Sequence, residues 1–198
     1  MASLKTVCVV SLGSFLALAT GFVIASEVRA GDSQDEVPEG GTVDADTLAK
    51  ASAFAGEYTW VGGQKERDGL DAAIDTAMDA VSPMVRGLGR KRLVESNPIP
   101  KSLSIAVDGD AVDIRFDGDG HSASLDGTPI KAVSPFGDKV KISHRMRGSK
   151  LTEYIDGGQG DRHNTFKLGS DGKLTVDVQI TSGHLPVPVE YRLTFKRK

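Results

Sequence analysis

Short loops between alternating segments constrain this chain of 198 residues more than any other feature. From Leu103 to Phe195, apolar and polar residues alternate in successive segments, and turns such as Asp108-Gly109-Asp110 and Ser170-Asp171-Gly172 separate them. Alternation of this kind is typical of strands that are buried on one face only. A parallel crossover needs about a dozen residues or more, so strands joined this closely pair with their sequence neighbours. The sequence therefore predicts an antiparallel meander.

The rest of the domain adds one early strand and a helical region to this meander. A strand is expected at Phe54–Val61, and helical periodicity runs from about Arg67 to Glu95. Ser82-Pro83 divides that region into two helices, with Ser82 as the N-cap and Pro83 in the first turn. We predict a mainly β fold, an antiparallel up-and-down β-barrel of about nine or ten strands with a two-helix lid inserted after the first strand. A flattened sandwich is the alternative.

The N-terminal residues have the pattern of a secretory signal. Met1–Lys5 is positively charged, Val7–Ala25 is almost continuously apolar, and Val28-Arg29-Ala30 fits a cleavage site. We expect residues 1–30 to be a signal peptide, so that the protein is secreted or periplasmic and has no stable membrane anchor after cleavage. A retained transmembrane anchor is the alternative. Residues 31–50 are acidic and poor in large apolar side chains, which predicts a disordered leader, and residues 51–198 form one barrel domain.

Charge and cysteine content narrow the function. The formal net charge is −3, and this mild acidity argues against a nucleic-acid partner. The single cysteine, Cys8, lies inside the expected signal peptide, so the mature chain has no disulfide and no thiol chemistry. No phosphate-binding glycine loop, HExxH motif or nucleophile elbow is present, and we expect no catalytic residue and no cofactor. The oligomeric state is left open.

Three segments resemble the fatty-acid-binding proteins within the calycin group. Phe54-Ala55-Gly56-Glu57-Tyr58 is similar to the family's opening Phe-x-Gly-x-Trp, Pro100–Ile105 to the strand that follows its helix pair, and Tyr191–Phe195 to its closing strand. The resemblance implies a ten-stranded barrel with a two-helix portal that carries fatty acids or similar amphiphiles. Exported lipocalin-like barrels are an equally good comparison. One departure is clear, because the family's Arg-x-Tyr carboxylate anchor is missing or has moved: Arg192 and Thr194 face away from the apolar side of the last strand.

The candidate ligand-binding residues are those that alternation or helical spacing directs inward. His144 shares the apolar face of its strand, where a core role competes with that of a headgroup anchor. Glu153 is an inward carboxylate that needs a partner, a raised pKa or a wet barrel end. Methionine suits a pocket that accepts varied apolar ligands, although it also fills core gaps. The full predicted set is His144, Tyr191, Met146, Met78, Met84, Val85 and Glu153.

No metal site is expected. The histidines recur about once per hairpin, and their parity does not bring three of them together. Asp117-Gly118-Asp119-Gly120 resembles a calcium loop, but Thr128 stands where the bidentate Glu is needed, which favours a plain turn.

Three function hypotheses remain open. The leading one is an exported binding protein for a small hydrophobic or amphiphilic, lipid-like ligand. The second is a barrel enzyme, an isomerase or cyclase, that uses Glu153 and His144 as acid and base. The third is a packed barrel whose cationic strand Lys139–Arg147 contacts another protein.

Overall fold

The structure, a computed structural model, describes residues 43–198. The expected signal peptide and most of the expected leader lie outside these residues. One antiparallel sheet of ten strands and three helices make up the described part of the chain. The helices are α1 (Ala45–Ser52), α2 (Gly63–Asp79) and α3 (Pro83–Ser96), and the strands are β1 (Gly56–Trp60), β2 (Ser102–Asp108), β3 (Ala111–Phe116), β4 (Asp119–Ser124), β5 (Ile130–Val133), β6 (Lys139–Arg147), β7 (Lys150–Asp156), β8 (Gly160–Leu168), β9 (Lys173–Ser182) and β10 (Val189–Arg197).

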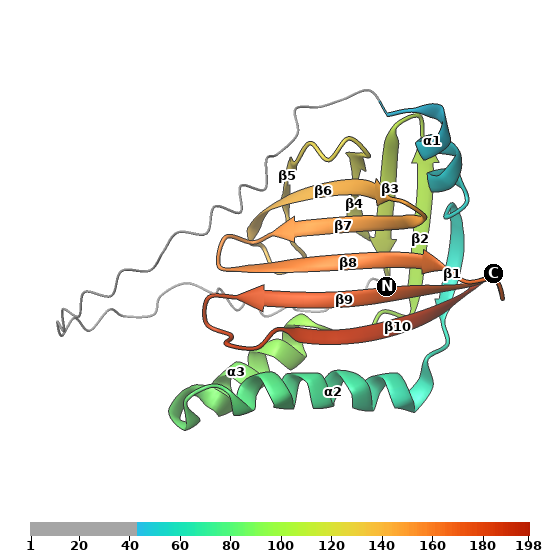
Figure 1. Cartoon of the computed structure of the whole chain (residues 1–198). Coiled ribbons are helices and arrows are strands. Elements are labelled where there is room, and N and C mark those ends of the chain that lie inside the picture. Colours follow the sequence, from blue (N-terminus) through green and yellow to red (C-terminus); the bar gives the residue numbers. More distant parts are fainter. Residues whose placement is uncertain (1–42) are drawn as a thin grey trace, which may run out of the picture.

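The strands form a nearly closed barrel, as predicted. Their order is β4-β3-β2-β1-β10-β9-β8-β7-β6-β5, so the first strand pairs with the last through Trp60 and Phe195. The two ends of the sheet, β4 and β5, do not pair with each other; an isolated bridge between Asp126 and Arg145 instead ties the segment after β4 to β6. In Figure 1, β6–β10 cross in front of β2–β4, and the space between these two walls is the barrel interior.

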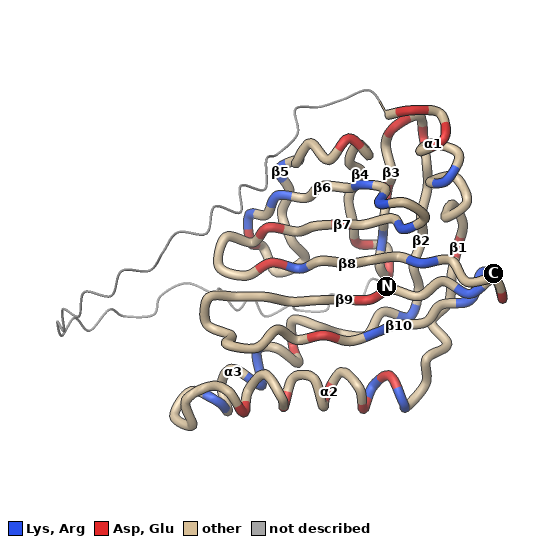
Figure 2. The backbone as a smooth tube through the Cα atoms, viewed as in Figure 1, with Lys and Arg blue, Asp and Glu red and all other residues tan. Residues whose placement is uncertain are grey.

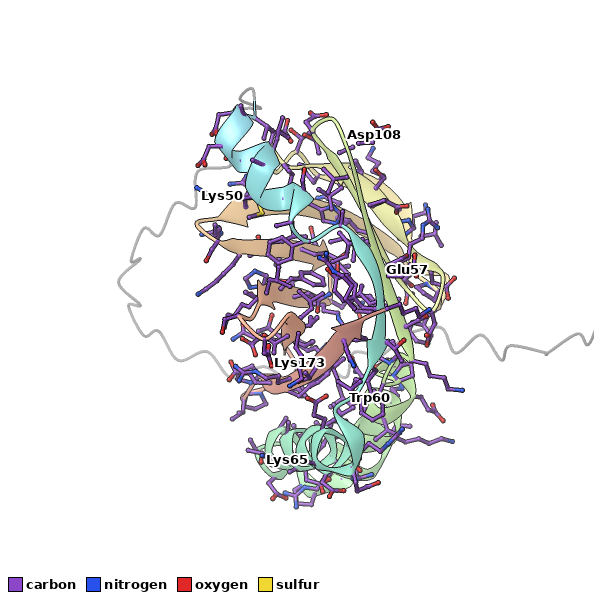
Figure 3. All side chains as sticks on the ribbon, turned by 90° about the vertical axis from the view of Figure 1, so that its right-hand side faces the viewer. Lys50, Glu57, Trp60, Lys65, Asp108 and Lys173 are labelled. Carbon is purple, nitrogen blue, oxygen red and sulfur yellow. The ribbon has the colours of Figure 1, made fainter. Side chains whose placement is uncertain are left out.

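Helices cover both ends of the barrel. α2 lies below β10 in Figure 1 and buries Leu70, Ile74, Ala77 and Met78 against the core. The insertion of α2 and α3 directly after β1 confirms the predicted two-helix lid. α1 lies at the opposite end, between β2 and β6, as Figure 3 shows by the positions of Lys50 on α1 and Lys65 on α2. No helix among residues 43–198 is long and apolar enough to cross a membrane.

Three local expectations need correction. Residues 45–50, assigned to a disordered leader, belong to α1, because Asp44 caps its N-terminus by accepting from Thr47 N and because Ala51 is buried in the core. β8 begins at Gly160, several residues before the apolar pair Phe166 and Leu168, since polar residues occupy its inward positions. Ser82 precedes α3, but its side chain makes no capping hydrogen bond.

The interior is filled by the protein's own side chains. The largest buried ones include Tyr58, Phe166 and Phe195, and Figure 3 shows sticks throughout the space between the two walls. A void wide enough for water would give its lining side chains accessible surface, yet most inward residues have almost none. Partly exposed inward residues, Ile155, Arg162 and Ile180, lie side by side on β7, β8 and β9.

Candidate functional site

Strand register places the inward residues of β6–β10 in rows that run across the strands. One row contains His144, Glu153, Asn164, Val178 and Tyr191, each opposite the next. A neighbouring row contains Ile142, Ile155, Arg162, Ile180 and Val189. The next row on the other side is wholly apolar: Met146, Leu151, Phe166, Val176 and Leu193. Polar groups therefore occupy one compact patch of an otherwise apolar wall.

Hydrogen bonds connect the members of this patch in sequence. His144 Nδ1 lies 3.0 Å from the carbonyl oxygen of Val112 on β3, across the barrel. His144 Nε2 lies 3.3 Å from Glu153 Oε1, and Asn164 Nδ2 donates to Glu153 Oε2 at 2.6 Å. The chain of contacts thus joins β3, β6, β7 and β8 inside the core.

Arg162 extends the same chain to the helical lid. Its Nε donates to Asn164 Oδ1 at 3.0 Å, and its Nη1 donates to Asn97 Oδ1 at 3.1 Å. Asn97 is the C-cap residue of α3, and its amide donates to Leu93 O at 2.8 Å. A continuous path of side-chain hydrogen bonds therefore runs from the end of α3 to the backbone of β3. We call these five residues, Asn97, Arg162, Asn164, Glu153 and His144, the interior polar chain.

The interior polar chain is deeply buried except at Arg162. His144 is 0%, Asn164 1% and Glu153 4% exposed, whereas Arg162 is half-buried. An unpaired buried charge costs several kcal/mol, and removing one partner of a buried pair costs about 3–5 kcal/mol. Glu153 meets this cost with a partner at each carboxylate oxygen, the Asn164 amide and His144 Nε2, rather than with a wet barrel end.

Arg162 has no carboxylate partner among residues 43–198. Its side-chain hydrogen bonds go to two neutral amide side chains, and none of the ion pairs in the described chain includes it. By contrast Arg192, on the outer face of β10, bonds Asp177 at 2.5 Å. Arg162 is thus an inward cation at the partly exposed part of the interior, with an isoleucine on the strand to either side.

The predicted ligand-binding residues divide into four groups, three of which lie in or against the barrel interior. His144 and Glu153 come together inside the barrel, as the acid–base hypothesis requires, but no substrate reaches them while the interior is filled. Tyr191 faces inward in the same row, four strands away from His144, and makes no hydrogen bond with a described residue through its hydroxyl. Met78 and Met146 pack into or against the core.

The two predicted residues on α3 lie elsewhere. Met84 is 94% exposed and Val85 is half-buried, and α3 buries none of its residues. Apart from α2, no element makes more than a few contacts with α3. The structure therefore places Met84 on the solvent side of the lid.

Three members of the interior polar chain were not predicted: Arg162, Asn164 and Asn97. The parity signal for two of them was present, because Arg162 and Asn164 alternate with His163 in the same phase as Phe166. Because these two successive inward positions are polar, the alternation of apolar and polar residues does not indicate a strand there. No comparable signal marks Asn97, whose role depends on how the chain leaves α3.

The outer face of β8–β10 carries an open groove of about 520 Å³, which His163, Asp177, Gln179, Glu190 and Arg192 help to line. Arg192 pairs with Asp177 in this groove, and Glu190 accepts a hydrogen bond from Gln179. Burial would raise the pKa of Asp177, but hydrogen bonds from Arg192 and Lys167 outweigh it and lower that pKa. Burial, with a smaller contribution from the charge of Arg147, lowers the pKa of His163. Every carboxylate and guanidinium that lines the groove thus has a hydrogen-bond partner, which for Glu190 is the neutral Gln179.

Two further expectations concern metal ions and the cationic strand. Within residues 43–198 no group of three His, Cys, Asp or Glu side chains is placed to hold a metal ion. The Asp117 carboxylate instead accepts from Lys101 N and Ser102 N, which makes Asp117–Gly120 a structural turn. On β6, Lys141 pairs with Asp156 at 3.5 Å, and Figure 2 shows Lys and Arg spread along that strand.

No protein-family model and no curated protein matches this chain. Among solved structures, it is similar to lipid binding protein 8 of Caenorhabditis elegans, with 16% identity over 74% of this chain and 96% of that one and a TM-score of 0.48. It is also similar to a secretory abundant heat soluble protein of Ramazzottius varieornatus, with 13% identity, the same coverages and a TM-score of 0.49. A third similar structure is fatty-acid-binding protein 1 of Echinococcus granulosus, with 14% identity over 73% of this chain and 97% of that one and a TM-score of 0.47.

These values concern the fold alone. The strand order and the helix pair after β1, established from this chain's own structure, are those that the sequence resemblance to fatty-acid-binding barrels implied.

Proposed function

We propose that this protein binds a small amphiphilic molecule with an anionic head, such as a fatty acid, in the barrel interior beneath α3, and performs no chemistry on it. The observation that carries the proposal is Arg162, an inward and half-buried guanidinium bonded only to amides. A carboxylate is the natural complement of such a group, because charge-assisted bidentate pairs are stronger than bonds to neutral amides. The structural relatives with fatty-acid-binding names agree with this ligand class.

The apolar part of the ligand would lie along the row of isoleucines that flanks Arg162. Ile155 and Ile180 are directly opposite Arg162 on the adjacent strands and are partly exposed. Apolar area withdrawn from water contributes about 25 cal/mol per Å². Because the interior is filled, binding requires α3 to move and core side chains to change rotamer. The weak attachment of α3 supports this route.

A fluorescent fatty acid, titrated into delipidated full-length protein, tests this function. We expect saturable binding that is weakened about tenfold or more in Arg162→Leu, since a hydrogen bond to a charged group contributes about 1.5–3 kcal/mol. Arg192→Leu is the matched control, because it removes an arginine from the outer face of β10. A methyl ester of the same acid should bind the wild type and Arg162→Leu alike.

Two results would contradict the proposal. The first is the absence of binding to the wild-type chain. The second is equal affinity of Arg162→Leu and wild type for the free acid, which would show that the guanidinium does not meet the head group.

The filled interior also agrees with the third hypothesis, a packed barrel whose cationic strand contacts another protein. No ion pair involves Lys139, Arg145 or Arg147 within residues 43–198, so the outer face of β6 offers three cations to an acidic protein partner. This chain would bind an acidic protein instead of a small ligand if two results were found together. It would bind no fatty acid in the titration, and an acidic protein surface would retain it in a way that depends on these three cations.

We also propose that the protein is exported and that its leader is removed after Ala30. The supporting pattern is the positive N-terminus, the apolar run and the Val28-Arg29-Ala30 site. N-terminal sequencing of the protein recovered from outside the cytoplasm should begin at Gly31. Recovery of the intact chain in the membrane fraction would instead indicate a retained anchor.

A further inference from the structure

We propose that His144 and Glu153 form a buried proton-binding site, in which the folded protein holds one proton more than the unfolded chain at mildly alkaline pH. The inference rests on the geometry of the interior polar chain and does not depend on the proposed ligand. It gives a built-in response to pH to the polar chain that connects the core to the helical lid.

The first step is the identity of the atom that faces β3. His144 Nδ1 lies 3.0 Å from the carbonyl oxygen of Val112. A carbonyl oxygen only accepts hydrogen bonds, so Nδ1 must carry a proton. A neutral imidazole has a single N–H, and that N–H is therefore already used.

The second step concerns the other ring nitrogen. In a neutral ring Nε2 would present a lone pair to Glu153 Oε1 at 3.3 Å. A carboxylate is an acceptor only, and two facing lone pairs repel each other strongly where both side chains are buried. The contact is satisfied once an additional proton lies between the two groups.

The third step places that proton on the ring. Glu153 Oε2 already receives the Asn164 amide at 2.6 Å, and the guanidinium of Arg162 lies just beyond Asn164. Both features favour the negative carboxylate. With the proton on Nε2, His144 donates to Val112 and to Glu153, and Glu153 accepts two bonds, so no partner in the pair is left unsatisfied.

Few other ionisable groups face this pair. On the strands, the remaining inward titratable residues among those described are Tyr58 on β1, Asp119 at the exposed end of β4, His121 on β4, Arg162 on β8, Tyr191 on β10, and Arg197 at the exposed end of β10. Glu153 is the one buried carboxylate among them. The pair therefore dominates proton binding inside the barrel.

The sign of the pH effect follows from the proton count. Above the usual titration range of histidine, the unfolded chain has a neutral His144 and an ionised Glu153, whereas the folded pair keeps the extra proton. Stability must then fall as the pH rises, with the unfolding equilibrium constant growing up to about tenfold per pH unit. The stabilisation is complete below that range and disappears as the pair releases its proton.

Glu153→Gln tests the proposal. The new amide would donate to His144 Nε2 and would accept from Asn164, so the whole chain is satisfied by a neutral ring. Denaturant unfolding between about pH 7.5 and pH 9 measures the free energy of unfolding of both proteins. This free energy should fall with rising pH in the wild type and should stay flat by comparison in Glu153→Gln. His163→Gln is the control. Burial lowers the pKa of His163, so its effect on stability lies at acid pH, and this variant should run parallel to the wild type above about pH 7.5.

Ring ¹⁵N spectra of the wild type give a second measurement that does not require any variant to fold. We expect both ring nitrogens of His144 to be protonated in the wild type at neutral pH. Where Glu153→Gln folds, Nε2 of His144 in that variant should be unprotonated. An unprotonated Nε2 in the wild type at neutral pH would overturn the proposal, and so would parallel pH–stability curves for the wild type and Glu153→Gln.

Discussion

Asn164 is the residue that allows two opposite charges to share the core without touching. Its amide nitrogen donates to Glu153 at 2.6 Å, and its amide oxygen accepts from Arg162 at 3.0 Å. A direct Arg162–Glu153 pair would neutralise the guanidinium and leave no group for an anionic ligand. The inserted amide keeps Glu153 satisfied while Arg162 stays open to a stronger partner.

Glu66 has a corresponding role at the start of the lid. Its carboxylate accepts from Trp60 Nε1 at 2.8 Å and from the backbone N–H of Thr194 at 2.9 Å. Arg67 lies over the Trp60 ring, 4.6 Å from its centre, and Figure 3 shows Trp60 next to α2. One acidic side chain thus fixes the first turn of α2 to both β1 and β10, and the weak part of the lid begins only after α2.

At the scale of elements, α2 and α3 differ sharply in how they are held. α2 buries four apolar residues against the core, whereas α3 buries none and is joined to the barrel interior through Asn97 and Arg162. Helices in proteins owe most of their stability to packing of an apolar face, so α3 should open first. We therefore expect α2 to be the fixed half of the lid and α3 the half that opens.

Gly87 and Gly89 provide a matched test of this difference. A methyl group at Gly87 meets no atom within 4 Å, so Gly87→Ala should stabilise α3 by about 1 kcal/mol, slow the exchange of its amides and slow ligand entry. A methyl group at Gly89 would lie 2.8 Å from Met78 Sδ, so Gly89→Ala gains less or loses stability. Hydrogen exchange of α3 amides measures both variants. Equal protection in the two variants would show that α3 does not pack on Met78 as described.

The elements also show how far the sequence predicts this protein. Loop length and alternation predict the ten-strand meander because every short turn forces neighbours to pair, and parity places His144 and Glu153 inside. Alternation does not predict the start of β8, because Arg162 and Asn164 are polar residues at inward positions. It also gives no account of α1, whose helix depends on the cap at Asp44 and on tertiary contacts of Leu48 and Ala51.

For the molecule as a whole, the two ends of the barrel are closed in different ways. At the lid end, α2 packs on the core through apolar side chains but α3 is joined to the interior by the hydrogen bond between Asn97 and Arg162, whereas the α1 end is closed by apolar packing of Leu48, Ala51 and Phe54. The turn after α1 is held in addition by Tyr58, whose hydroxyl donates to Phe54 O at 2.6 Å. A ligand should therefore enter at the α3 end, and the α1 end should contribute mainly to global stability.

Phe54 measures the contribution of the α1 end. Its side chain is 2% exposed, so Phe54→Ala leaves a cavity in the core and should lower the free energy of unfolding by about 3–5 kcal/mol. Phe136→Ala is the matched control, because that ring lies 42% exposed in the loop between β5 and β6 and should change stability by less than about 1 kcal/mol. Urea unfolding at neutral pH compares the two. If Phe54→Ala were as mild as Phe136→Ala, α1 and its turn would not be part of the barrel's cooperative core, and the α1 end would also be open to a ligand.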